Sequence, residues 1–282
     1  MQDLEETLQQ ALELGESEEW EAMATLLHEA LESHPDNAEF LCWAGIAERE
    51  MGEEGIAYDL FRRSLEAAPE DPLILALAGN GVAAFDDPAA EAALRSAALM
   101  APELPEARLF YGAYLAREGM SEEAMRELDA AKELDPEDPA VALERGVALA
   151  LKGDPEAEME FERAVSLDPE DGWARVLLGL ALLEFGDPEE GVESAAEQLD
   201  AGARMRPDDV EAQFLAAVAM AVLGRDAAAW EMLERGRMTA VGTDLQVADA
   251  VEERIEGEEG AEEFLRTTLL PMAWHDRLMV RP

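Results

Sequence analysis

Apolar residues recur along this chain three and four positions apart, and the arrangement repeats about every 34 residues. Prolines mark the repeat: they stand at Pro35, Pro69, Pro102, Pro136, Pro169 and Pro207, separated by 34, 33, 34, 33 and 38 residues. Twelve residues before each proline lie Met23, Ala57, Ala90, Ala124, Ala157 and Ala195. Eight before lie Leu27, Phe61, Leu94, Leu128, Phe161 and Leu199. Such self-similarity at a fixed period indicates an array of repeated structural units.

A small residue recurs about 24 positions before each proline, with four extra residues intervening in the last case: Ala11, Gly45, Gly79, Gly112, Gly146 and Gly179. We expect this residue on a first helix, where a neighbouring helix crosses too closely for a larger side chain. The alanine and the Leu or Phe four residues later share one face of a second helix and pack against the first. The pattern therefore predicts two helices in each repeat.

Helix-terminating residues support this division. Each proline ends a second helix, because it lacks an N–H group and disfavours helix at the residue before it. Two residues later stands a capping residue for the next helix, namely Asn37, Asp71, Asp138, Asp171 or Asp209. Pro72 and Pro139 then occupy first helical positions, where a missing N–H costs nothing. Between the two helices of a repeat, glycine breaks are expected at Gly52, Gly119, Gly153, Gly186 and Gly224, the fourth in the sequence Gly186-Asp187-Pro188.

Two helices in about 34 residues, with small, alanine, Leu/Phe and proline positions in phase, resemble the tetratricopeptide repeat family. The resemblance implies an all-α fold, a right-handed α-solenoid (superhelix) of antiparallel helix pairs that binds other polypeptides. We expect seven repeats over residues 1–238, ending near residues 35, 69, 102, 136, 169, 207 and 238. The seventh lacks the proline. Four extra residues in the sixth repeat predict a longer second helix there, since four residues make about one turn.

Residues 239–282 do not follow the pattern. Residues 243–256 and 261–270 are predicted to form a final helix pair, a cap over 239–270 on the last repeat. Residues 271–282 form a cationic, apolar tail.

The charge balance restricts the partners. The chain holds 66 acidic and 21 basic residues, a formal net charge of −45, and its only lysines are Lys132 and Lys152. Such a chain repels phosphate groups, so nucleic acid and anionic membrane surfaces are excluded as partners. Two explanations stay open: the acidity attracts basic partners, or it suits a high-salt (halophilic) cytoplasm.

A single cysteine, the absence of a signal-peptide pattern and the lack of a long uncharged apolar run predict a cytoplasmic protein.

Added salt is expected to raise the melting temperature, because it screens repulsion between the many carboxylates. Thermal melts from low to molar sodium chloride check this. A melting temperature that stays flat or falls over that range contradicts it.

Residue patterns that carry catalysis are scarce. The histidines are His28, His34 and His275, and none stands in a metal-binding spacing. Cys42 lies in an apolar helical segment, which favours a buried, inert thiol. The triplet 79–81 (Gly-Asn-Gly) falls within a helix and not in a phosphate-binding loop. The acidic turns 135–138 and 168–171 lack the glycine-centred loop of a calcium site and are explained by helix capping. We therefore expect no enzyme, no metal and no cofactor.

Each first helix also carries three mostly apolar residues on one face. They stand three positions before, one position after and four positions after the small residue. This run, here called the apolar stripe, begins with Leu8 and Leu12. In the tetratricopeptide repeat family it lines the concave groove where ligands lie. The predicted groove residues are Trp43, Ile46, Arg49, Asn80, Leu109, Ala113, Arg117, Leu143, Val147, Val176, Leu180, Phe214 and Val218. Lysine is absent, which argues against a clamp for a C-terminal carboxylate. An apolar or amphipathic segment with basic flanks fits better. Alternatively, neighbouring first helices crowd together and the stripe packs as core.

The tail gives a second hypothesis. Residues 266–282 hold three arginines against one aspartate, together with Trp274, Arg277, Leu278 and Met279. This segment docks on an apolar, acid-rimmed surface of its own chain or of a neighbouring copy, or it frays as chain ends commonly do. Three functional classes follow: a protein-binding adaptor or scaffold, a self-assembling structural protein (a homo-oligomer completed by the tail), and an accessory domain for an enzyme on another chain.

Overall fold

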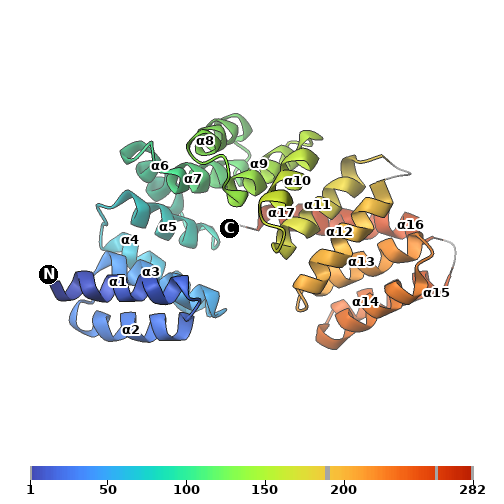
Figure 1. Ribbon diagram of the computed structural model, residues 1–282, viewed down its shortest axis with the longest axis horizontal. Helices are drawn as coiled ribbons and strands as arrows, with labels where there is room; N and C mark the ends of the chain where they lie inside the picture. Colours follow the sequence, from blue (N-terminus) through green and yellow to red (C-terminus); the bar gives the residue numbers. More distant parts are fainter. Residues whose placement is uncertain (1, 188–190, 258–259, 281–282) are drawn as a thin grey trace. The chain divides into compact units, whose positions relative to one another are not determined.

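The computed structural model describes residues 2–187, 191–257 and 260–280, and these residues form helices joined by short connections, without a strand. They divide into two compact units, residues 2–135 and 136–280. Successive helices pair within each unit, and each pair stacks on the next (Figure 1). The predicted all-α architecture of stacked helix pairs is confirmed. No helix in the described ranges is both long and apolar enough to cross a membrane.

Unit 1 contains four helix pairs. Its helices are α1 (Gln2–Glu16), α2 (Trp20–Ser33), α3 (Ala38–Glu50), α4 (Glu54–Glu66), α5 (Pro72–Ala83), α6 (Ala89–Met100), α7 (Pro105–Arg117) and α8 (Ser121–Leu134). The odd-numbered helices are the first helices of their repeats. α3 packs on α1 and α5, and α5 packs on α7, so first helices of adjacent repeats touch directly.

Unit 2 continues the same order. Its helices are α9 (Pro139–Leu151), α10 (Glu156–Leu167), α11 (Gly172–Phe185), α12 (Gly191–Met205), α13 (Val210–Val222), α14 (Asp226–Thr239), α15 (Asp244–Glu256), α16 (Ala261–Phe264), the π-helix η1 (Leu265–Leu269) and α17 (Leu270–Met279). At 15 described residues, α12 is one residue longer than α2, α8 and α14 and does not show the full extra turn expected there; residues 188–190 of the insertion lie outside the described residues.

The predicted glycine positions are packing sites between the two helices of a repeat. A Cβ atom at Gly146 would lie 2.6 Å from the Phe161 ring, and one at Gly112 would lie 2.7 Å from Leu128. Gly45, Gly79 and Gly179 meet the Leu or Phe of their own second helix in the same way. The glycines therefore let each bulky second-helix residue approach the first-helix backbone.

The predicted helix caps are confirmed. The side chains of Asn37, Asp71, Asp138, Asp171 and Asp209 each accept a hydrogen bond from a backbone N–H in the first turn of the following helix. Each second helix before a marker proline ends two or three residues ahead of it.

The predicted glycine breaks hold at four of five positions. Gly52, Gly119, Gly153 and Gly224 have positive φ, as left-handed helix-terminating glycines do. Gly186 differs: it ends α11 with φ −68° and ψ 172°. A Cβ there would lie 2.4 Å from the Leu182 carbonyl oxygen, so a close backbone approach and not a left-handed turn requires this glycine. Pro188, the third residue of this expected break, lies outside the described residues.

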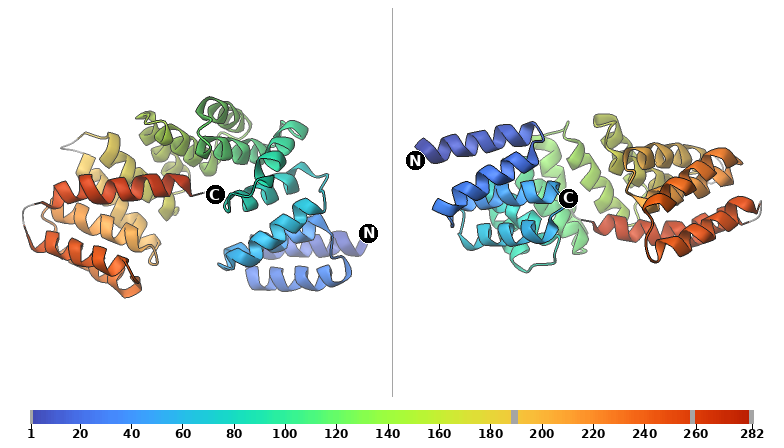
Figure 2. Two further views of the ribbon diagram at one scale, coloured as in Figure 1. Left: turned by 180° about the vertical axis from the view of Figure 1, so that it is seen from behind. Right: turned by 90° about the horizontal axis from the view of Figure 1, so that it is seen from below.

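The C-terminal region differs in detail from the expected helix pair and separate tail. The final helical segment runs without interruption from Ala261 to Met279, past the expected boundary at residue 270 (Figure 2). Its central π-helical turn, Leu265–Leu269, immediately precedes Pro271. A proline cannot donate to the preceding turn and crowds its carbonyl, and the wider π turn accommodates both effects. Residues 281–282 of the predicted tail lie outside the described residues.

Candidate functional site

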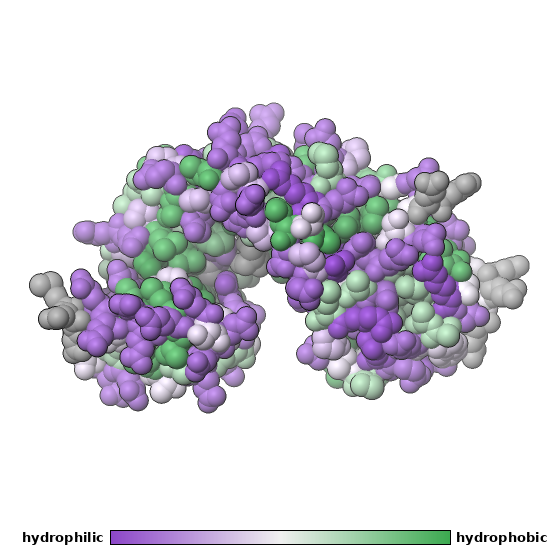
Figure 3. All heavy atoms as spheres, in the orientation of Figure 1, coloured by the Kyte–Doolittle hydropathy of each residue, from purple (hydrophilic) through white to green (hydrophobic). Residues whose placement is uncertain are grey.

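The apolar stripe is partly accessible at the α1–α3 end of unit 1. Leu8 and Leu12 of α1, and Trp43, Ile46 and Arg49 of α3, are half-buried. Trp43 and Ile46 pack by one side on a core cluster that includes buried Ile74 and Val82 of α5. In the space-filling view, apolar atoms gather over α3 and α5 and are surrounded by polar ones (Figure 3).

The stripe is closed towards the α5–α7 end of unit 1. Asn80, Leu109, Ala113 and Arg117 are buried, each at most 8% exposed. α5 and α7 pack directly against each other, and alanine or glycine at many contact positions permits this approach. Arg117 lies along its own helix and donates from Nη1 to the Ala113 carbonyl at 3.1 Å. Here the alternative, in which neighbouring first helices crowd together, describes the packing.

In unit 2 most stripe residues are buried, and the chain's own C-terminal segment packs on the first helices that carry them. Val147, Val176, Leu180, Phe214 and Val218 are at most 2% exposed, and Leu143 is half-buried. The segment Ala261–Met279, here called the C-terminal strap, contacts first helices of three repeats. Its α16 and η1 parts lie against α13, and α17 lies against α11 and α9.

The C-terminal strap is amphipathic. Leu265, Leu269, Ala273 and Arg277 follow one another at intervals of four and are at most 5% exposed, so they form one buried face. Met272, next to Ala273 in the sequence, is 50% exposed. The strap therefore presents apolar side chains and one cation to the first helices beneath it.

Arg277 forms the main polar contact of the strap. Its Nη2 and Nη1 donate to the two carboxylate oxygens of Asp209 at 2.6 and 2.9 Å, and its Nε donates to Glu211 at 2.8 Å. The guanidinium also lies 5.2 Å from the centre of the Trp173 ring. A two-pronged contact with one carboxylate and a single contact with a second suit the planar fork of arginine.

The ionisation of this cluster reflects both burial and pairing. Burial acts to raise the pKa of Asp209, but hydrogen bonds and attraction from Arg277 outweigh it and leave this pKa below its ordinary value. Burial raises the pKa of Glu211, and the attraction of Arg277 offsets this only in part. Burial acts to lower the pKa of Arg277, but hydrogen bonds to Asp209 and Glu211 and the attraction of both carboxylates together outweigh it and leave this pKa raised. The cluster thus holds a permanent cation over one firmly ionised carboxylate and a second, more weakly ionised one.

The other predicted docking residues also contact this face. Trp274 is half-buried and packs edge-on against Phe185 of α11, with ring centres 5.7 Å apart. Leu278 is 2% exposed and Met279 is half-buried. Arg266 adds a hydrogen bond from Nη1 to the Leu183 carbonyl at 3.2 Å.

Sequence reasoning missed the residues that receive the strap. Asp209 was assigned only to helix capping, which it also performs through a bond from the Ala212 N–H. The available signal lay in two adjacent repeats. One repeat begins with a tryptophan, Trp173, and the first helix of the next repeat begins with two acids, Asp209 and Glu211.

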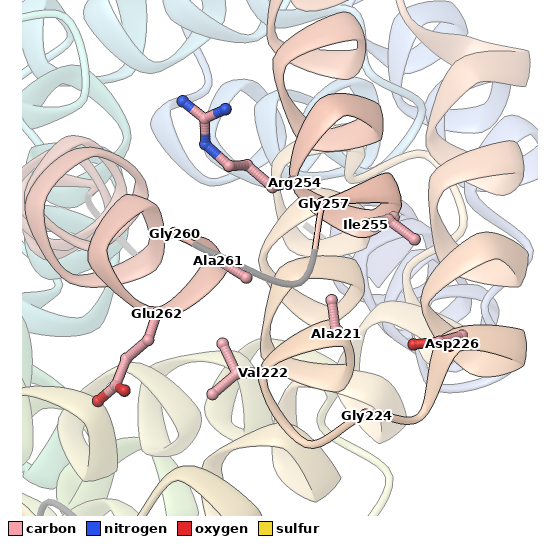
Figure 4. Close-up of a pocket in the computed structure, with 10 residues that line it drawn as sticks. All are labelled: Ala221, Val222, Gly224, Asp226, Arg254, Ile255, Gly257, Gly260, Ala261 and Glu262. Atoms are coloured by element: carbon pink, nitrogen blue, oxygen red, sulfur yellow. The ribbon is translucent and has the colours of Figure 1, made fainter.

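A depression of about 610 Å³ lies where α13, α14, α15 and α16 meet (Figure 4). Its lining includes Arg254, Asp226 and Glu262. The guanidinium of Arg254 lies 5.3 Å from the centre of the Phe264 ring. The lining residues include no histidine, cysteine or serine that could act as a nucleophile or general base.

Elsewhere the chemistry is structural. Cys42 is fully buried, and burial raises the pKa of its thiol far above the ordinary value, as expected for an inert cysteine. Within the described ranges no three His, Cys, Asp or Glu side chains cluster as metal ligands would.

Both units are α-solenoids in which each repeat is an antiparallel helix pair. The family model for the tetratricopeptide repeat matches residues 8–72 and 121–171. The chain therefore carries tetratricopeptide repeats. Proteins of this family generally act by binding other proteins and are typically non-catalytic scaffolds.

Solved structures support the fold. The Cut9–Hcn1 hetero-tetramer of APC/C is similar at 19% sequence identity and a TM-score of 0.68, over 86% of this chain and 48% of that one, so this chain spans about half of it. A tetratricopeptide repeat protein from Parabacteroides merdae is 14% identical over 91% and 100% of the two chains, with a TM-score of 0.57. A thermophilic TPR protein from Thermus thermophilus is 21% identical over 65% and 98%, with a TM-score of 0.56. No curated protein sequence gives a match.

Proposed function

We propose that this chain is a non-enzymatic adaptor that binds an apolar or amphipathic polypeptide segment with basic residues on the apolar stripe. The observation that supports this proposal is the C-terminal strap, an amphipathic helical segment with a buried arginine that packs on the first helices α9, α11 and α13. A face that accommodates such a helix from its own chain has the shape and charge to accommodate one from another chain.

The accessible part of the stripe in unit 1 is the proposed binding surface. Leu8, Leu12 and Ile46 are half-exposed there, and the acidic Glu16 and Glu50 next to them along α1 and α3 are exposed. Apolar side chains flanked by carboxylates favour a ligand with an apolar face and basic ends, because the charges attract it and steer its approach. We also propose that the protein is cytoplasmic.

The self-assembling alternative draws on the same strap. Its packing within unit 2 favours docking on the chain's own surface over docking on a neighbouring copy. Size-exclusion chromatography with light scattering separates the two: a monomer supports an adaptor, and a closed oligomer supports self-assembly.

Four synthetic peptides of equal length test the proposed ligand: an amphipathic helix with arginine flanks, the same helix with glutamate flanks, and a scrambled version of each. The full-length chain is expected to bind only the amphipathic arginine peptide. Ile46→Glu, which places a charge on the half-buried stripe, should weaken binding about tenfold or more. Fluorescence anisotropy measures both effects.

Leu99→Glu provides the matched control, because Leu99 is 72% exposed at the end of α6 and lies off the stripe. Its affinity should equal that of the unmodified chain. Equal binding of the scrambled arginine peptide would reduce the interaction to general charge attraction and defeat the proposal. So would an Ile46→Glu variant that binds normally.

A further inference from the structure

We propose that the C-terminal strap is a built-in competitor. It occupies a second binding site on α9, α11 and α13, and an amphipathic helix of another protein takes this site when the strap is displaced. The partner helix carries an arginine at the position of Arg277, with apolar residues four, eight and twelve positions before it. This inference rests on the proposed function but concerns a different face, so the two can fail separately.

The surface beneath the strap determines this partner. It combines Phe185 and Trp173 of α11, which lie against Trp274 and Arg277, with the carboxylates Asp209 and Glu211. These groups belong to the repeats and stay in place when the strap leaves. With the strap gone, Asp209 keeps Arg206 at 3.4 Å but Glu211 loses its cation, so an uncovered site selects for a cationic occupant. A neutral apolar helix would leave Glu211 uncompensated.

The strap is a weaker helix than a regular segment of its length. A π-helical turn and Pro271 interrupt its hydrogen-bond ladder, and its outward side exposes Met272. Its main advantage is covalent attachment, which gives it a high local concentration at the site. A regular helix of another protein that makes the same contacts has a higher affinity for the site than the strap has. This higher affinity lets it compete with the strap, although the strap is tethered to the site.

The test uses a labelled synthetic peptide of residues 261–280 as the competing helix. The receptor is the full-length chain with Ile46→Glu, which removes the proposed site of unit 1. In this background, Arg277→Glu weakens the strap on its own chain and leaves the receiving surface intact. The peptide is expected to bind this variant about tenfold or more tightly than it binds the chain with an unmodified strap.

Two controls separate site recognition from charge. Met272→Glu adds a negative charge to the exposed side of the strap, and it should bind the peptide no better than the chain with an unmodified strap. A peptide carrying the Arg277→Glu change should bind the released receptor about tenfold or more weakly than the original peptide. Equal binding of the two peptides overturns the proposal.

Hydrogen exchange on the unmodified chain keeps the proposal testable if Arg277→Glu fails to fold. Saturating peptide should speed amide exchange in residues 270–279, because the displaced strap loses its packing, while α14 stays protected. Unchanged exchange in the strap at saturating peptide overturns the proposal. A native dimer in which two copies exchange their straps also overturns it, since the occupant is then a second copy.

Discussion

Replacing Phe61 with alanine is expected to destabilise unit 1 by about 3–5 kcal/mol, the usual cost of removing a buried aromatic side chain. Phe61 is 1% exposed, and its ring fills the space over two glycines of successive repeats. A Cβ at Gly45 would lie 2.9 Å from this ring, and one at Gly81 would lie 2.3 Å from it. The ring thus joins α4 both to α3 of its own repeat and to α5 of the next. Urea denaturation, with hydrogen exchange in α3–α5, measures the loss.

A double-mutant cycle gives this prediction its sharpest form. Gly81→Ala alone should be strongly destabilising, because its methyl group overlaps the Phe61 ring. In the Phe61→Ala background the same methyl group enters vacated space, so the second change should cost far less. Gly55→Ala is the matched control: nothing lies within 4 Å of a Cβ there, and alanine should stabilise α4 by about 0.5–1 kcal/mol. Additive effects of Phe61→Ala and Gly81→Ala would contradict this description of the contact.

Arg277→Met is expected to destabilise unit 2 by about 3–5 kcal/mol at neutral pH, the cost of leaving a buried charge without its partner. Arg277 is 5% exposed, and its removal leaves Glu211 without its cation and Asp209 with only Arg206, 3.4 Å away. The penalty should shrink in acid, because protonation removes the charges that need compensation.

The direction of the pH dependence follows from the two carboxylates. The pKa of Asp209 is lowered, so its stabilising contribution is present above its ordinary value of 3.8 and is lost as the pH falls below that value. The pKa of Glu211 is raised, so its contribution is unfavourable at neutral pH and this cost disappears as the pH falls towards its ordinary value of 4.5. Arg277→Met lacks the cation that lowers both pKa values, so it gains more stability than the unmodified chain as the two carboxylates are protonated, and the stability difference should narrow from neutral pH to below about pH 4.

Arg204→Met is the control for this series. Arg204 also binds two carboxylates, those of Asp200 and Glu231, but its side chain is 39% exposed, and such surface pairs contribute about 0–1 kcal/mol. Chemical denaturation at a series of pH values compares the two variants. Equal penalties, or a penalty for Arg277→Met that does not change with pH, would show that the Arg277 ion pairs do not stabilise the strap.

Local features of the fold could be predicted because each depends on residues close in sequence. Asp171 caps α11 two residues ahead, and Gly146 meets Phe161 within the same hairpin. Their spacing is fixed by helix geometry, so the repeat pattern contains the contact. Gly186 was misassigned because glycine serves both left-handed turns and close backbone approach, and the sequence alone does not separate the two uses.

The accessibility of the stripe could not be predicted, because it depends on residues distant in the chain. Arg277 meets Asp209 across 68 positions, and no repeat period relates the two. Leu180 and Ile46 occupy corresponding stripe positions on two first helices, yet Leu180 is buried, on a helix that the strap contacts, and Ile46 is half-exposed. The apolar pattern identifies a face that favours burial but not the element that covers it.

The strap also changes how unit 2 comes apart. In a solenoid each repeat ordinarily touches only its neighbours, so repeats at an end can detach one at a time. A single helix that contacts α9, α11 and α13 links three repeats at once, and the loss of any one repeat forfeits contacts with the strap as well. This coupling makes the three repeats unfold together as one cooperative block.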